Sequence, residues 1–117
     1  MVREYADYIR DLLDAIEKVQ TFIKDLDYED FKKDDKTKFA VIRALEIIGE
    51  ATKHISDDVR VRYPEVPWKE MAGMRDVLAH DYFGVDEATV WLTAKEKIPQ
   101  LKPSIEKILA ETGNEKG

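Results

Sequence analysis

The chain has 117 residues, of which 44% are hydrophobic and 38% are charged, and its formal net charge is −6. This length and apolar content suit one packed domain, and the absence of cysteine excludes disulfides, thiol nucleophiles and cysteine-ligated zinc. The acidic balance disfavours binding to DNA. No long apolar run and no secretory leader are visible, which favours a cytoplasmic protein without a membrane partner.

Apolar residues recur at spacings of three and four along most of the chain, which is the pattern of amphipathic helices. The first predicted helix spans residues 4–26, and a single helical turn over residues 28–31 follows it. The second begins at Asp34 or Asp35, since either side chain can cap it, and runs to about residue 55. Its broad apolar stripe predicts more than one packing neighbour.

A short helix that Ser56, Asp57 or Asp58 can cap comes next, and two further helices follow it. Pro67 suits the first turn of a third helix, for which Gly84 provides the end. Asp86 is the predicted cap of a fourth helix. Pro99 and Pro103 fall inside that last helix and should kink or restart it, because proline lacks a backbone N–H and clashes with the preceding turn.

Four amphipathic helices joined by short loops, without strand-like alternation, predict an all-α fold. The expected architecture is an antiparallel, up-and-down four-helix bundle with short extra helical turns. It should form a single domain over residues 1–112, followed by a frayed tail over residues 113–117.

The residues that can carry chemistry gather in one stretch, Met74-Arg75-Asp76-Val77-Leu78-Ala79-His80-Asp81-Tyr82. The chain shows no glycine-rich phosphate loop and no three-ligand metal set, so neither a cofactor nor a metal is expected. Asp76 lies four residues before His80 on the same helical face, where its carboxylate can orient the imidazole. Arg75 and His80 are about 140° apart around the axis, so they border one cleft only if the helix loosens or a second copy contributes.

An arginine and a histidine suit the cleavage of RNA without a metal. The 2′-hydroxyl of RNA adjoins a phosphodiester and can attack it. Histidine titrates near neutrality, so it can accept the hydroxyl proton or protonate the leaving oxygen. The forked arginine supplies a fixed positive charge for the phosphorane. Arg75 and His80 are therefore the candidate catalytic residues.

Each of these residues also has an ordinary structural interpretation. Arg75 can belong to a surface ion pair, His80 can satisfy carbonyls at a helix end, and Tyr82 can be an amphipathic helix-end residue. His54 follows Glu50 by four residues, a spacing typical of pairing on one helix. The large apolar side chains are more typical of a core or an interface than of a ligand site, namely Trp68, Met71, Met74 and Trp91.

Arg75, His80 and Tyr82 form an Arg-x4-His-x-Tyr pattern that resembles the signature of the HEPN superfamily, and of its HepT-like toxin branch in particular. That branch comprises prokaryotic four-helix bundles encoded beside a minimal nucleotidyltransferase. The resemblance covers most of the chain. Its similar segments are Arg43–Ala51 in the second helix, Pro67–Asp76 before the motif, and Val85–Asp86, Val90–Trp91 and Ile98–Leu101 around the last helix.

The resemblance implies a HEPN-like bundle that is a metal-independent endoribonuclease, cleaving tRNA or mRNA as a homodimer whose two motifs meet across the interface. It implies that Arg75 stabilises phosphate charge, that His80 is the general base or acid, and that Asp76 supports His80. It also implies that the nucleotidyltransferase antitoxin adenylylates Tyr82 to silence the toxin. AMP on Tyr82 would add bulk and negative charge beside the cleft and repel RNA phosphate.

Two other functions stay open at this point. The acidic charge and the broad apolar helix faces favour a non-catalytic partner that docks a nucleotidyltransferase. A purely structural dimeric bundle is expected if Arg75 and His80 lie far from any cleft. For a nuclease, a net charge of −6 repels RNA at long range. Lys69 and Arg75, with Arg60 and Arg62, would then need to form a local positive patch.

Overall fold

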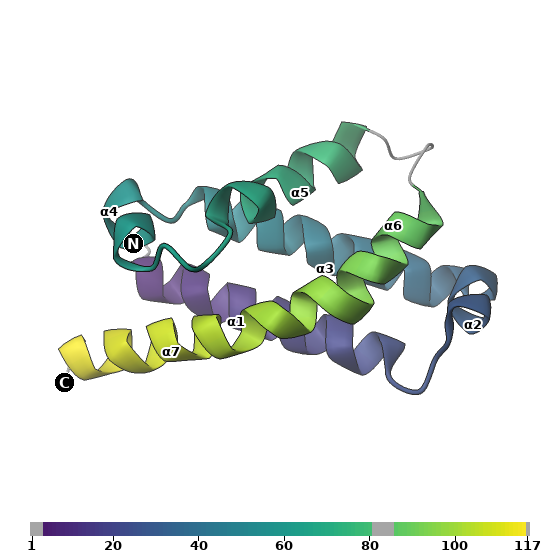
Figure 1. The fold of residues 1–117 in the computed structure, drawn as a ribbon, viewed down its shortest axis with the longest axis horizontal. Helices are drawn as coiled ribbons and strands as arrows, with labels where there is room; N and C mark the ends of the chain where they lie inside the picture. Colours follow the sequence, from purple (N-terminus) through teal and green to yellow (C-terminus); the bar gives the residue numbers. More distant parts are fainter. Residues whose placement is uncertain (1–3, 81–85, 117) are drawn as a thin grey trace.

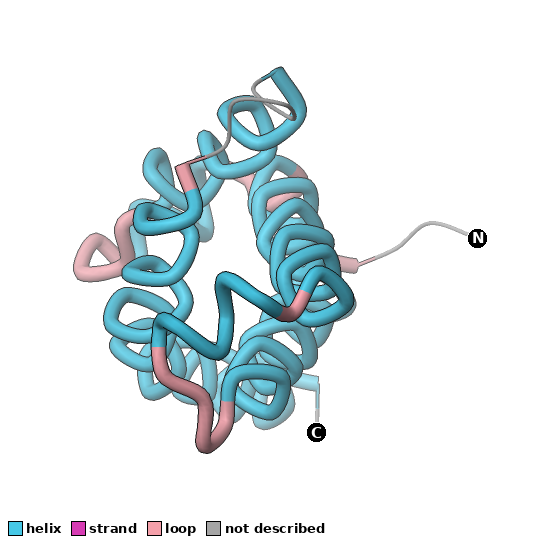
Figure 2. Tube along the Cα trace, turned by 90° about the vertical axis from the view of Figure 1, so that its right-hand side faces the viewer, coloured by secondary structure: helices cyan, strands magenta, loops and turns pink. Residues whose placement is uncertain are grey.

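The computed structural model describes residues 4–80 and 86–116, with side chains described for residues 4–74 and 86–112. In chain order its helices are α1 (Tyr5–Ile23), α2 (Tyr28–Lys33), α3 (Asp35–Lys53), α4 (Asp57–Arg62), α5 (Trp68–His80), α6 (Glu87–Leu92), the π-helical turn η1 (Thr93–Lys97) and α7 (Ile98–Lys116). No strand occurs in these ranges, and Figure 2 shows them as helices and loops. None of these helices is long and apolar enough to span a membrane.

The long helices alternate in direction, so that α1, α3, α5 and the α6–η1–α7 stretch form an up-and-down bundle (Figure 1). Helix α3 packs against α1 and also against α5, while α7 packs against α1. The broad apolar stripe of α3 therefore serves two neighbours, as its sequence predicts. The predicted all-α helical bundle is confirmed.

The core is built from the apolar stripes that the helical spacing predicts. On α1, the side chains of Ile9, Leu12 and Ile16 are completely buried. The ring of Phe31, on the short helix α2, packs against that of Trp91 on α6, with the two centroids 5.2 Å apart. This contact closes one end of the bundle. Burying a side chain of this size stabilises the fold by about 1.5–3 kcal/mol.

Helix ends follow local polar groups and backbone conformation. Asp34, one of the two predicted caps, accepts hydrogen bonds from the amide of Thr37 at 3.0 Å and from its hydroxyl at 2.6 Å. The predicted cap at Asp86 is confirmed, because its carboxylate accepts from the Ala88 amide at 3.0 Å. Helix α1 ends earlier than predicted, since Asp25 takes a φ of 65°, a left-handed conformation that terminates a helix.

The last helix accommodates its prolines with a widened turn. Pro99 lacks an N–H, and in a regular helix its ring clashes with the carbonyl of Lys95. The π-helical turn η1 precedes it and relieves that clash, and Pro103 lies inside α7. Helix α7 continues to Lys116, through residues predicted to form a frayed tail. A glycine inside a helix costs only about 1 kcal/mol relative to alanine, so Gly113 does not end α7. No proline follows it to interrupt the backbone hydrogen bonds.

Candidate active site

Helix α5 carries the arginine–histidine motif, and its N-terminal half is anchored in the bundle. The indole N–H of Trp68 donates to the carbonyl of Tyr63 at 3.0 Å. Met71 is completely buried, and α3 is the main packing neighbour of α5. These contacts fix the helix on which the motif begins.

The motif lies on the half of α5 beyond these anchors. The backbone of Arg75, Asp76 and His80 belongs to α5, whereas their side chains and the whole of Tyr82 lie outside the described residues. In a regular helix, positions 73, 76 and 80 follow one stripe. The C-terminal end of α5 lies at the margin of the bundle (Figure 1). A meeting of Arg75 and His80 in one cleft therefore stays a prediction.

A groove of about 230 Å³ runs beside α5, between this helix, α3 and the α6–η1 stretch. It is lined by Leu45, Glu70, Gly73, Met74, Thr89, Val90, Thr93 and Lys97. Gly73 and Met74 directly precede the motif, and Lys97 Nζ lies 3.6 Å from Glu70 Oε1, which links η1 to α5. The sequence alone did not predict this groove. Its walls come from three separate segments, so no local sequence pattern indicates it.

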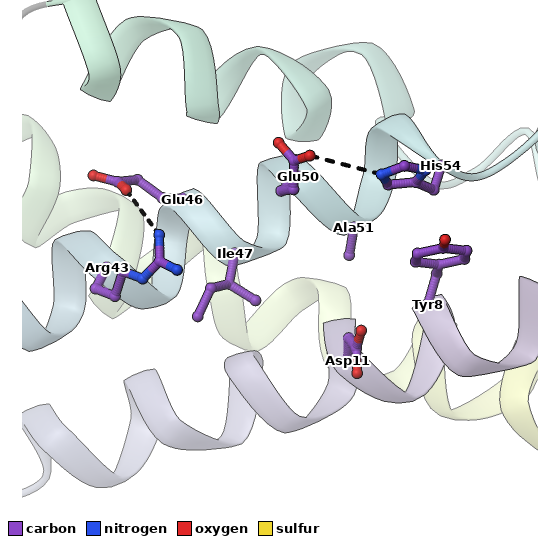
Figure 3. A pocket seen from close by; sticks show the side chains of 8 residues that line it. All are labelled: Tyr8, Asp11, Arg43, Glu46, Ile47, Glu50, Ala51 and His54. Carbon is purple, nitrogen blue, oxygen red and sulfur yellow. Dashed lines mark hydrogen bonds and ion pairs between the residues drawn. The ribbon is translucent and has the colours of Figure 1, made fainter. Parts of the chain in front are cut away.

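A second, more polar hollow of about 450 Å³ lies between α1 and α3 (Figure 3). The ring of Tyr8 stacks on that of His54 with centroids 4.6 Å apart. His54 Nε2 lies 3.6 Å from Glu50 Oε1, so the predicted pairing of these two residues is confirmed. Among the side chains that the structure describes, no three His, Cys, Asp or Glu come together as a metal-binding group.

The cations expected to attract RNA have different roles in the fold. The Arg60 guanidinium donates to the carbonyls of Thr52 at 2.9 Å and Ile55 at 3.0 Å, which satisfies the end of α3. Arg62 lies over a tyrosine ring of α1, 5.9 Å from its centroid. Lys69 is exposed in the first turn of α5. These carbonyls are neutral and leave the charge of Arg60 intact, so the positive patch stays a prediction.

The large apolar side chains divide into two groups. Trp68, Met71 and Trp91 are buried in the core, as predicted. Met74 is only partly buried, and it packs against the core from the wall of the groove beside α5. Three of the four therefore lie in the core, whereas Met74 borders it and lines the groove next to the motif.

Comparison with known proteins places the chain in a family. The family model "Ribonuclease HepT-like" matches residues 12–108, from α1 into α7. A Thermococcus cleftensis protein named "Probable ribonuclease HepT" is 54% identical over 108 residues, which cover 92% of this chain and 98% of that protein. A Methanocaldococcus jannaschii protein named "Putative RNase MJ0125" is 50% identical over 107 residues, covering 92% of each. No solved structure matches significantly. The predicted resemblance is thereby confirmed, and the chain belongs to the ribonuclease HepT-like family.

Proposed function

We propose that this protein is a metal-independent endoribonuclease and the toxin of a toxin–antitoxin pair, acting in the cytoplasm through Arg75 and His80. One observation carries the proposal: a chain of the ribonuclease HepT-like family contains an Arg-x4-His-x-Tyr stretch, and the backbone from Arg75 to His80 belongs to α5. The names of the two relatives, both ribonucleases, support the same activity.

The proposed reaction is a transesterification within the RNA chain. An imidazole removes the proton of the 2′-hydroxyl, whose oxygen forms a bond to phosphorus while the bond from phosphorus to the 5′-oxygen breaks. An imidazolium protonates the leaving oxygen, which yields a cyclic phosphate and a free 5′-hydroxyl. Arg75 would stabilise the charge on the phosphoryl oxygens, and Asp76 would hold His80 in the reactive tautomer.

A homodimer would supply both proton carriers. The reaction needs one group that accepts a proton and one that donates it, whereas each chain brings a single His80 to the motif. The end of α5 lies at the margin of the bundle (Figure 1). We therefore propose that two copies pair with their motifs facing one another, which also places each Arg75 near the partner's His80.

The proposed antitoxin is a minimal nucleotidyltransferase that transfers AMP from ATP to the hydroxyl of Tyr82 and releases pyrophosphate. Tyr82 follows His80 by two residues. The added nucleotide would place bulk and negative charge beside the catalytic groups and repel the phosphate of RNA. Mass spectrometry of the protein, purified with and without the antitoxin, would detect AMP on the peptide that contains Tyr82.

The alternative function is a non-catalytic bundle that binds a nucleotidyltransferase. The acidic net charge and three large exposed apolar side chains favour it, since Phe39 is 54%, Val61 76% and Leu92 50% exposed. This alternative predicts a stable complex with the transferase and no cleavage of RNA. It also predicts that a His80→Ala substitution leaves the complex unchanged.

Cleavage assays with the two histidine variants test the proposal. Purified protein is incubated with tRNA and mRNA in EDTA, which removes free divalent metals. We expect His80→Ala to lower the cleavage rate at least about 100-fold, the usual contribution of a general acid or base. The matched control is His54→Ala, which removes the chain's other imidazole from the separate hollow between α1 and α3. Equal cleavage by His80→Ala and the parent would refute the proposal.

A further inference from the structure

Gly73 lies in the middle of α5, two residues before Arg75, and the packing of the described chain does not explain it. Glycine is a poor helix former, so alanine at this position would make α5 more stable. A Cβ built there would meet no heavy atom within 4 Å beyond the local helix. Among the residues that the structure describes, none requires glycine at this position or fills the space beside it.

This open space belongs to the groove between α5, α3 and the α6–η1 stretch. Its walls include the buried side chains of Leu45 and Val90. The hydroxyl of Thr89 donates to the capping carboxylate of α6 at 2.9 Å, and that of Thr93 donates to the carbonyl of Thr89 at 2.8 Å. Because both hydroxyls bond within their own helix, the groove offers mainly apolar contact.

The size and position of the groove suit a single nucleobase. Its volume of about 230 Å³ is below the roughly 300–1,000 Å³ of pockets that enclose drug-sized ligands. Position 80 lies on the same stripe of α5 as Gly73, about 10 Å further along the axis. Proteins that read RNA hold unstacked bases of single strands in such slots. Lys97 and Glu70 also line the groove, where they pair with each other.

The charge of the molecule supplies an independent argument. Proteins that bind nucleic acids usually gain affinity by neutralising phosphates with Lys and Arg. This chain has a net charge of −6, and Arg60 is engaged with the end of α3. Contact between a base and an apolar wall provides affinity that does not depend on cations.

We propose that this groove is a nucleobase subsite, and that Gly73 allows the nucleotide beside the cleaved phosphate to approach α5. The inference rests on the proposed cleavage of RNA and adds a specificity for single strands, since a base held in a duplex cannot enter the slot. A base fixed here aligns its ribose with the motif on the same helix, which is what an in-line attack by the 2′-hydroxyl requires.

Binding of an RNA that cannot be cut tests the subsite. The probe is a single-stranded oligonucleotide with 2′-O-methyl groups, used intact and with one abasic position moved along it. We expect Gly73→Leu to weaken binding of the intact probe about tenfold, by filling the groove, and Gly73→Ala to weaken it less while raising Tm. The matched control is Ala110→Leu, which places the same leucine side chain at an exposed position of α7.

The abasic probes locate the effect. At one position, removing the base from the probe should weaken its binding to the parent protein as much as Gly73→Leu weakens binding of the intact probe. The same abasic probe should bind the Gly73→Leu variant no more weakly than the intact probe does. If the Gly73→Leu variant binds the intact probe as tightly as the parent does, the proposed subsite is wrong. Cleavage of RNA by the parent would not rescue it. If Gly73→Leu instead changes the sedimentation of the protein and leaves binding intact, the groove is an interface between copies. If the parent protein binds RNA through the groove but never cleaves it, the proposed nuclease activity is wrong and the proposed nucleobase subsite is supported.

Discussion

Tyr63 connects the end of α4 with the last helix. Its hydroxyl donates to the carboxylate of Glu111 on α7, and its carbonyl accepts from the indole of Trp68. The residue is only 6% exposed. The hydrogen bond to Glu111, with burial as a second cause, raises the pKa of Tyr63 to about 12. The folded state therefore favours the protonated hydroxyl, and this interaction depends on pH.

A Tyr63→Phe variant should be less stable than the parent by about 1 kcal/mol at neutral pH, because it lacks the donor for Glu111. The pKa of Tyr63 is higher in the folded protein than the ordinary value of 10.0. The stabilisation is thus complete below about pH 10 and is lost as the pH rises through about 12. Urea unfolding across this range measures the difference, with Tyr28→Phe as the control. A difference that stays constant up to pH 12 would contradict the assignment.

At the scale of an element, the start of α3 depends on Asp34. Its carboxylate accepts from both the amide and the hydroxyl of Thr37, and these two bonds lower the pKa of Asp34. Because the pKa is lower in the folded protein, this cap stabilises α3 above the ordinary pKa of 3.8 and loses its effect as the pH falls below it. The cap therefore has a testable dependence on acid.

Asp34→Ala should lower Tm by a few degrees at pH 7, because it removes a good N-cap. Asp34→Asn should keep most of the stability, since asparagine caps equally well, and it should remove the dependence on acid. The control is Asp35→Ala at the other predicted cap, whose carboxylate is exposed and pairs with Lys38 at 3.2 Å. A larger loss from Asp35→Ala than from Asp34→Ala, in thermal unfolding followed by circular dichroism, would show that the cap is misassigned.

The elements differ in how far the sequence predicts them. Helix order and the caps at Asp34 and Asp86 follow from local spacing and side-chain chemistry, which the sequence displays directly. The way in which the last helix accommodates Pro99 does not follow from the local sequence. A break in the helix and a π-helical turn both relieve the clash, and packing decides between them. The groove beside α5 depends on how α3, α5 and α6 approach one another. Its walls therefore cannot be found within any one segment.

At the scale of the whole molecule, part of the positive charge is paired within single helices. Several Lys and Arg side chains pair with carboxylates three or four residues away on their own helices, namely Arg10, Lys18, Lys32, Lys38 and Arg43. Such exposed pairs contribute little to stability. They do offset cations that would otherwise attract phosphate, whereas Arg60, which is held by neutral backbone carbonyls, keeps its charge. An acidic surface with paired cations is thus poorly suited to gather RNA at long range.

The affinity for single-stranded RNA should therefore depend only weakly on salt. A protein with six to ten phosphate contacts loses about 10³–10⁵ in affinity between about 50 and 200 mM salt. This protein should lose less than about tenfold over the same range, because it neutralises few phosphates and gains affinity from a base in an apolar groove. Titrations with the 2′-O-methyl oligonucleotide at several salt concentrations measure the slope.

Two variants separate the contributions to that slope. Lys69→Gln removes an exposed cation from the first turn of α5 and should reduce the slope by about one phosphate contact or less. Gly73→Leu should lower the affinity at every salt concentration and leave the slope unchanged, since it removes apolar contact and no charge. A steep slope in the parent, unaffected by either variant, would mean that cations elsewhere gather the RNA. The acidic surface would then face away from the bound strand, and phosphate contacts would replace the groove as the source of affinity.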